Sequence, residues 1–237
     1  MSAANDERRA ATLAAIRQSL GRAPLSPAAR GELDARIAAH ATNIIPDRAR
    51  GDAGELVDRF AAMAEAAACT LVRVDDAAAV PGAVTDYLRA HNLPTVATLA
   101  PDDWLTGLDW DSQPMLELRQ GTPRPEDLVS VTPAFAGVAE TGTLLLASGP
   151  GHPSTLNFLP DHHVVVLKAS QVSGAYEDAF ARLRAARSGA DAAMPRTLNM
   201  ITGPSRTGDI ELTIHLGAHG PRSLHIILID DQEAARD

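Results

Sequence analysis

Cysteine, positive charge and long apolar runs are all scarce in this sequence, and each scarcity excludes a class of protein. Of the 237 residues only Cys69 is a cysteine, which excludes an internal disulfide and a cysteine-rich zinc or iron–sulfur site within the chain. No apolar run approaches the ~20 residues of a membrane helix, and the charged start MSAANDERRAATL lacks a signal-like apolar core. The formal net charge of −9 disfavours non-specific binding to nucleic acid or to anionic membranes. We therefore expect a cytoplasmic protein with no membrane span, no nucleic-acid partner and a packing role for Cys69.

Aromatic residues are also few, at 3% of the chain, so alanine, valine, leucine and isoleucine must fill the interior. The 45% hydrophobic and 22% charged residues are the proportions of an ordinary globular protein. A chain of this size removes roughly 70% of its unfolded surface from water on folding. A substantial core is therefore expected.

Helical and strand-like patterns alternate from Gly51 onward, which predicts an α/β fold. The apolar segments TLVRV, LLLAS, HVVVLKAS, TLNMIT and LHIILID are separated by amphipathic segments with helical spacing. Such a pattern indicates a mainly parallel sheet with helices on both faces. We expect residues 1–50 to form a separate N-terminal helical arm and residues 51–237 to form the α/β domain. The arm would be an appendage or a subunit contact of a homo-oligomer. The proline-rich stretch 101–133 has no clear assignment.

Ligands of open α/β sheets gather beyond the carboxyl ends of the strands, so unusual residues at strand ends are candidate site residues. The first such segment is TGPSRTGDIE. Gly203 permits a positive φ, and the N–H groups of residues 205–208 could form a nest for an anion, with Arg206 binding its oxygens in a bidentate manner. The spacing resembles the start of a P-loop, but Asp209 stands where a lysine is required, which argues against a Walker nucleotide site. The alternative is a tight turn capped by Asp209 or Thr207.

The second segment is AGVAETGTLLLASGPG, in which Glu140 precedes a glycine turn and an apolar strand. Its carboxylate could serve as a general base, a nucleophile or a fixed partner for Arg206. Thr141 and Thr143 add hydroxyl groups beside flexible backbone. The alternative is that Glu140 pairs with an arginine and orders the turn.

Histidines give a weaker indication of function. His162 or His163 could be a proton shuttle, although a surface or capping role is commoner. His215 and His219 have i, i+4 spacing, but Gly217 interrupts any helix and no glutamate frames a zinc motif. No metal site is predicted.

Four separated segments, AETGTLLL, LPDHHVVVL, TGPSRTGDIE and GAHGPRSLHIILID, together resemble the LutC/YkgG lactate-utilisation family, whose module is the LUD domain. The resemblance runs from about Val129 to the C-terminus. It implies a fold of the NagB/RpiA/CoA-transferase-like group and a role in oxidising L-lactate to pyruvate beside two partner proteins that carry iron–sulfur clusters. No cofactor is expected in this chain.

The motif positions carried over form an expected functional surface. Glu140 and His219 are the candidate catalytic residues. The candidate substrate- or anion-binding residues are Thr141, Gly142, Thr143, Gly203, Pro204, Ser205, Arg206, Thr207, Asp209, Glu211 and Gly220.

Three functions remain open from the sequence. The leading one is a non-cluster component of a lactate-oxidising complex, with Arg206 holding a small carboxylate such as lactate or pyruvate. The second is a free-standing enzyme of the CoA-transferase or sugar-phosphate-isomerase type that uses Glu140. The third is a structural adaptor in which the glycine turns form a protein interface.

Overall fold

The computed structural model describes residues 3–21, 25–187, 194–208 and 214–231. The chain divides into two compact units, Met1–Asn43 and Ile44–Asp237. Asp209 and Glu211 lie outside the described residues, so the structure says nothing of their predicted roles. Within the described ranges, no helix combines the length and apolar character needed to cross a bilayer.

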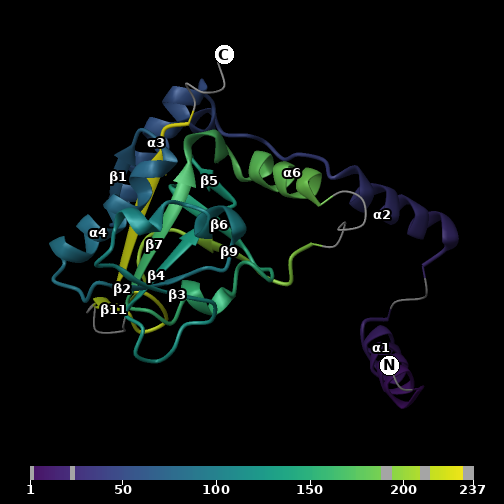
Figure 1. Ribbon diagram of the computed structural model, residues 1–237. Coiled ribbons are helices and arrows are strands. Elements are labelled where there is room, and N and C mark those ends of the chain that lie inside the picture. The colour runs from purple at the N-terminus through teal and green to yellow at the C-terminus, as the bar shows by residue number, and fades with distance from the viewer. Residues whose placement is uncertain (1–2, 22–24, 188–193, 209–213, 232–237) are drawn as a thin grey trace. The chain divides into compact units, whose positions relative to one another are not determined.

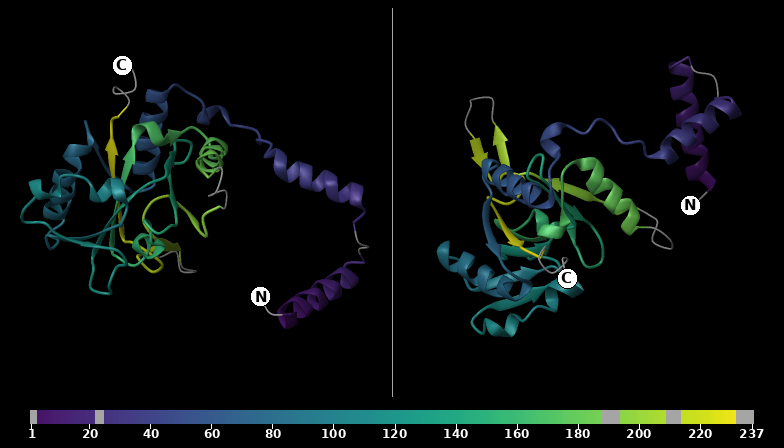
Figure 2. Two further views of the ribbon diagram at one scale, coloured as in Figure 1. Left: turned by 45° about the vertical axis from the view of Figure 1, so that its right-hand side comes forward. Right: turned by 90° about the horizontal axis from the view of Figure 1, so that it is seen from above.

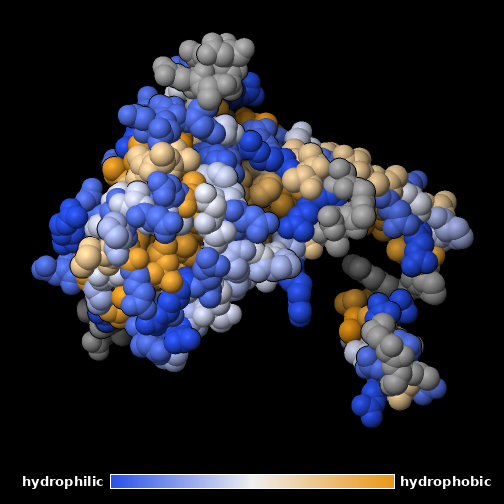
Figure 3. Space-filling model, viewed as in Figure 1, coloured by the Kyte–Doolittle hydropathy of each residue, from blue (hydrophilic) through white to orange (hydrophobic). Residues whose placement is uncertain are grey.

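The first unit consists of two helices, α1 (Ala3–Ser19) and α2 (Pro27–Ala39), as the sequence predicts for this arm. Ser26 caps α2 by accepting a hydrogen bond from the N–H of Ala29 at 3.2 Å. Neither helix buries a side chain among the described residues, and both carry exposed apolar residues (Figure 3). These are Leu13 and Ile16 in α1, and Leu33 and Ile37 in α2.

A six-stranded parallel sheet organises the second unit (Figure 1). Its strands lie in the order β1 (Thr70–Val74), β12 (Ser223–Ile229), β7 (His162–Lys168), β4 (Val129–Pro133), β2 (Val96–Leu99) and β3 (Glu117–Gln120). β7 and β12 pair along their whole length, from His162 opposite Ser223 to Lys168 opposite Ile229. The predicted α/β fold with a parallel sheet is confirmed.

Helices α3 (Ala53–Ala66) and α4 (Val80–Ala90) cover opposite faces of this sheet, as predicted (Figure 2). Asp52 and Glu55 start α3 with a reciprocal capping box, in which each side chain accepts the other residue's backbone N–H at 2.9 and 3.0 Å. Alternation along β7 sends Val164 and Val166 toward α4 and the intervening side chains toward α3. Both faces of the sheet are therefore apolar cores.

A second sheet lies on the α3 side, which the sequence did not predict. Its strands are β8 (Val172–Ser173), β5 (Ala136–Val138), β6 (Thr143–Ala147) and β9 (Leu198–Ile201). β6 runs antiparallel to both β5 and β9. The segments LLLAS and TLNMIT thus belong to this sheet and not to the parallel one. Their apolar runs reflect burial between layers, which does not by itself identify the pairing partner.

The remaining elements are short or peripheral. They are α5 (Asp103–Thr106), α6 (Tyr176–Ala186), the hairpin β10 (Arg206–Gly208) with β11 (Ile214–Leu216), and the 3₁₀ turns η1 (Asp47–Ala49), η2 (Ala77–Ala79), η3 (Trp110–Ser112), η4 (Ser154–Asn157) and η5 (Ala169–Gln171). The unassigned stretch 101–133 therefore contains α5, η3 and two strands of the parallel sheet, β3 and β4.

Candidate functional site

The two glycine turns predicted from the sequence lie side by side. Leu144 of β6 pairs with Ile201 of β9, and the hydroxyl groups of Thr143 and Thr202 are hydrogen-bonded at 2.6 Å. Ser205 donates its backbone N–H to Pro221 O, just before β12 begins. This rim is at the amino ends of β7 and β12. The expectation that these turns lie beyond the carboxyl ends of the parallel strands is therefore wrong, because β6 and β9 belong to the second sheet.

Gly142 and Gly203 are required because both turns press against the last turn of α3. Their φ values are +65° and +78°, a region that residues with a Cβ rarely adopt. A Cβ on Gly142 would overlap the backbone of Ala64, and one on Gly203 would overlap the carbonyl oxygen of Ala67. The glycines thus allow close backbone packing.

Arg206 uses part of its guanidinium group to stabilise the end of α3. Its Nη2 donates to Ala67 O at 2.6 Å, where helix carbonyls lack partners and the helix dipole is negative. Cys69 is buried next to this contact, and burial raises the pKa of its thiol to about 11 despite a hydrogen bond from Gly203 and the charge of Arg206. The thiol therefore stays protonated near neutral pH, in keeping with the packing role expected for it.

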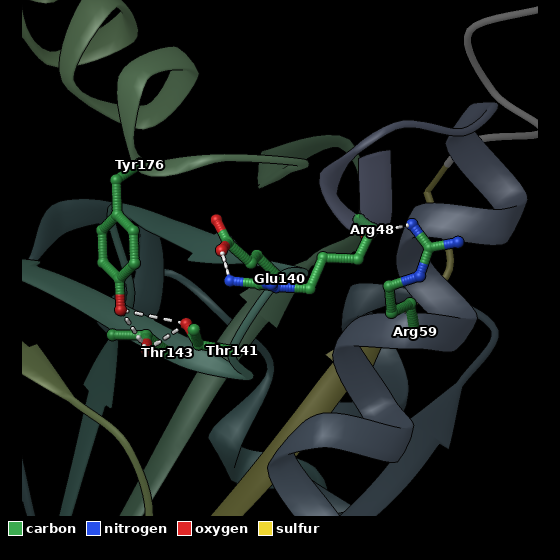
Figure 4. A network of polar contacts seen from close by, with 6 residues as sticks. All are labelled: Arg48, Arg59, Glu140, Thr141, Thr143 and Tyr176. Atoms are coloured by element: carbon green, nitrogen blue, oxygen red, sulfur yellow. Dashed lines mark hydrogen bonds and ion pairs between the residues drawn. The ribbon is translucent and has the colours of Figure 1, made fainter. Parts of the chain in front are cut away.

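Glu140 pairs with Arg48 and not with Arg206 (Figure 4). Its Oε1 accepts a hydrogen bond from Arg48 Nη2 at 2.6 Å, and its side chain is only 10% exposed. Arg59 in turn donates to the carbonyl oxygen of Arg48 at 2.6 Å, which fixes the segment that carries Arg48. Glu140 therefore matches the alternative in which it pairs with an arginine and orders the turn.

Thr141 and Thr143 belong to a small hydroxyl network (Figure 4). The Tyr176 hydroxyl at the start of α6 lies 2.9 Å from Thr141 Oγ1 and 2.8 Å from Thr143 Oγ1. Because Thr143 also bonds Thr202, these hydroxyl groups link the first turn to the second. Thr141, Gly142 and Thr143 support the rim without lining a cavity there.

A cavity of about 260 Å³, the amino-end pocket, lies between the two sheets beside this rim. It is bounded by the second residues of β7 and β12, His163 and Leu224, and by the end of β9. The predicted site residues that line it are Gly203, Pro204, Ser205, Arg206, His219 and Gly220. Glu140 and Thr207 do not line it.

Two further polar residues line the amino-end pocket, and both are almost completely buried. Asn157 is 1% exposed, and its side-chain oxygen and nitrogen have no hydrogen-bond partner in the described part of the chain. His163 is 0% exposed; its Nε2 lies 2.8 Å from Thr132 Oγ1, while its Nδ1 has no partner among those same residues. An unsatisfied buried polar group costs about 1–3 kcal/mol, so three such atoms on two residues that line one cavity suit a polar ligand.

The His163 imidazole is uncharged under ordinary conditions. Burial lowers its pKa from 6.5 to about 3, with a smaller contribution from nearby His152. The ring can therefore donate or accept one hydrogen bond at Nδ1, depending on its tautomer. Arg206 supplies the positive charge of the pocket, and Asn157 and His163 supply neutral hydrogen-bonding groups.

Sequence reasoning named His163 only as a possible proton shuttle and did not name Asn157. The segment GHPSTLNFLPDHH contains no motif that marks Asn157, because its burial depends on η4 lying against β4. That contact is visible in the bond from Ser130 Oγ to Leu156 O at 2.7 Å.

The fold and the pocket together define an α/β protein with a cavity between a parallel sheet and a mixed sheet. The family model of the LUD domain matches residues 128–229, a range that includes every residue lining the amino-end pocket. The resemblance to the LutC/YkgG lactate-utilisation family is confirmed for this part of the chain.

Curated relatives resemble segments of the chain. An uncharacterised protein of Neisseria meningitidis serogroup B is 40% identical over 96 residues, which is 40% of each chain. Lactate utilization protein C of a Geobacillus species is 32% identical over 104 residues, or 44% of this chain and 43% of that protein. Lactate utilization protein C of an Exiguobacterium species is 28% identical over 145 residues, 61% of each chain. The matched segments thus span between 40% and 61% of the length of these relatives.

A solved structure supports the fold. A DUF162 family protein from Deinococcus radiodurans superimposes with a TM-score of 0.57 at 20% identity, covering 76% of this chain and 99% of that one. At this level of identity the likeness concerns the fold alone.

Proposed function

We propose that this protein takes part in lactate utilisation, as a non-cluster component of a cytoplasmic system that oxidises L-lactate to pyruvate. We further propose that the amino-end pocket binds a small carboxylate such as lactate or pyruvate. The names of the similar proteins support the process. The observation that carries the pocket is that Asn157 and His163, which line the same cavity as Arg206, have buried atoms without a partner among the described residues.

The pocket offers a matching group for each part of a short hydroxy acid. Arg206 has one nitrogen engaged with Ala67 O, so its other N–H groups can bind the carboxylate. Asn157 and His163 can bind the hydroxyl or keto oxygen, because both have free hydrogen-bonding atoms without charge. Leu224 and Met200 provide an apolar wall for the methyl group.

Oxidising lactate to pyruvate removes two electrons and two protons, which an acceptor must receive. With a single buried cysteine, this chain has no ligand set for an iron–sulfur cluster. We therefore assign the clusters to partner proteins of the system and assign to this chain the binding and orientation of the carboxylate.

The position of Glu140 argues against the hypothesis of a free-standing transferase or isomerase. It requires Glu140 as a nucleophile or base in a ligand cavity, but Glu140 is paired with Arg48 and does not line the amino-end pocket. The structural-adaptor hypothesis is less favoured, because both glycine turns pack against α3 of the same chain.

Replacing Asn157 separates binding from folding. Asn157→Leu removes two unpaired polar atoms, so stability should stay equal or rise while affinity for L-lactate and pyruvate falls at least about tenfold. Asn199→Leu is the matched control, because Asn199 also has an unpaired buried nitrogen but does not line the pocket. Titration calorimetry measures affinity, and urea unfolding measures stability. Unchanged lactate affinity in Asn157→Leu, or an equal loss in Asn199→Leu, would remove the assigned pocket.

The role in the process has its own test. Deleting the gene should abolish growth on L-lactate as the carbon source, and the wild-type gene should restore it. Normal growth of the deletion strain would contradict the role in lactate utilisation, whatever the pocket binds.

A further inference from the structure

A second cavity lies at the opposite rim of the parallel sheet. This carboxyl-end pocket has a volume of about 420 Å³ and is bounded by Pro133, the last residue of β4, and Lys168, the last residue of β7. Asp102, which follows β2, closes a third side. The position is the one at which open parallel sheets usually bind ligands, and it shares no lining residue with the amino-end pocket.

Lys168 is the only lysine in the chain, whereas the other 20 cationic residues are arginines. Its Nζ lies 4.3 Å from the centre of the Trp104 ring, a cation–π contact that positions the ammonium group without neutralising it. No carboxylate among the described residues forms an ion pair with it. The ammonium group can therefore still bind an anion.

The neighbouring groups reinforce this charge. Arg187 also lines the cavity and adds a second cation, against the single carboxylate of Asp102, whose Oδ1 accepts the N–H of Leu105 at 3.0 Å. His152 lines the same cavity and has a buried Nε2 with no partner in the described part of the chain. The pocket thus combines two cations with one unpaired imidazole nitrogen.

We propose that the carboxyl-end pocket binds a second ligand, an organic molecule larger than lactate whose carboxylate or phosphate group is held by Lys168. His152 provides a polar contact to the same ligand, and Trp104 and Phe135 pack against its body. The volume suits a ligand of mononucleotide size better than a three-carbon acid. This proposal is independent of the proposed function, because it involves none of the residues of the amino-end pocket.

The single lysine permits a direct test. The full chain is treated with an acetylating reagent, and peptide mass spectrometry follows acetylation of Lys168, with the α-amino group as the internal reference. AMP and inorganic phosphate probe phosphate binding, and succinate probes carboxylate binding. We expect at least one of these probes, at about 10 mM, to slow Lys168 acetylation about fivefold or more without slowing that of the α-amine. The best protector identifies the oxyanion.

Variants locate the effect. Trp110→Phe leaves Trp104 as the only tryptophan, so its fluorescence reports the carboxyl-end pocket. In this background Lys168→Met should lose the fluorescence response to the best probe. The control Arg182→Met, which removes a cation that donates to Ser170 O outside the pocket, should keep the response.

Three results would overturn the proposal: no probe protects Lys168, protection is equal at the α-amine, or Lys168→Met responds as wild type does. Asn157→Leu separates the two sites, since it should weaken lactate binding at least about tenfold and leave protection of Lys168 intact. Loss of lactate binding alone therefore bears on the proposed function and not on this second site.

Discussion

The two rims of the parallel sheet carry cavities of opposite character. The amino-end pocket is built from neutral, buried groups on Asn157 and His163, and its one cation, Arg206, is partly engaged with α3. The carboxyl-end pocket has an unpaired ammonium group on Lys168 and an acid, Asp102, that is already engaged. The first arrangement selects by hydrogen-bond geometry, whereas the second selects mainly by charge.

The two rims also differ in how the backbone forms them. At the amino end, Gly142 and Gly203 press against α3, so the pocket wall is fixed by backbone packing. At the carboxyl end, a Cβ on Gly149 would meet nothing within 4 Å, and one on Gly151 would lie 3.3 Å from Pro101 O, so neither position has an overlap as close as that at Gly203. The amino-end pocket should therefore respond to backbone changes far more strongly than the carboxyl-end pocket.

Glycine substitutions should show the largest difference between the rims. Gly203→Ala forces both a positive φ and an overlap with Ala67 O, and we expect a loss of about 4 kcal/mol or more in the free energy of unfolding. Gly149→Ala should change it by less than about 1 kcal/mol. Chemical denaturation of both variants measures the contrast, and equal losses would contradict it.

Acid should weaken the protein partly through the amino-end rim. Burial lowers the pKa of His163 from 6.5 to about 3 and that of His225 to about 4. As the pH falls below 6.5, these histidines bind protons in the unfolded chain but not in the native state. The free energy of unfolding therefore falls until the pH reaches the native pKa values. Each of the two histidines lowers the free energy of unfolding by up to about 1.4 kcal/mol per pH unit in this range.

The variant His163→Gln measures how much of the pH dependence of stability comes from the amino-end rim. Denaturation at pH 7.5, 6.5, 5.5 and 4.5 should give a shallower pH dependence for His163→Gln than for wild type. Burial also lowers the pKa of His152, but the charge of Asp102 opposes this effect, so His152→Gln should reduce the slope less. An unchanged slope in His163→Gln would show that its imidazole is not buried in neutral form.

Arg206→Met should give a smaller effect on stability than on binding. The substitution removes a charged hydrogen bond at the end of α3, for which we expect a loss of about 1 kcal/mol. Lactate affinity should fall at least tenfold, since the carboxylate loses its cation. Calorimetry and urea unfolding on one preparation measure lactate affinity and stability. A loss of stability with normal lactate affinity would show that Arg206 only caps α3 and does not bind the carboxylate.

Glu140→Gln should have the smallest effect of the series. Its partner Arg48 is 69% exposed, and ion pairs with an exposed partner contribute between zero and about 1 kcal/mol. Binding at both pockets should match wild type, because Glu140 lines neither. A loss of lactate binding in this variant would show that Glu140 contributes to the binding site.

The sequence was sufficient for the α/β class. It also predicted that Glu140, Arg206 and His219 meet at one site; Arg206 and His219 line the amino-end pocket, and Glu140 does not. The sequence did not indicate at which rim of the parallel sheet Arg206 and His219 lie. An apolar strand has the same pattern in either sheet, so nothing local in LLLAS or TLNMIT shows that β6 and β9 pair antiparallel with each other. Asn157 and Lys168 were missed for a similar reason: their environment is created by chain segments distant in sequence.

The place of β12 in the sheet has a consequence for synthesis. β12 is the last strand along the described chain, yet it lies between β1 and β7. Until residue 229 has left the ribosome, β1 has no neighbour and the apolar edge of β7 stays open to water or to another strand. A ribosome stalled before that point should carry a protease-sensitive nascent domain, and the emergence of β12 should convert it to a resistant one.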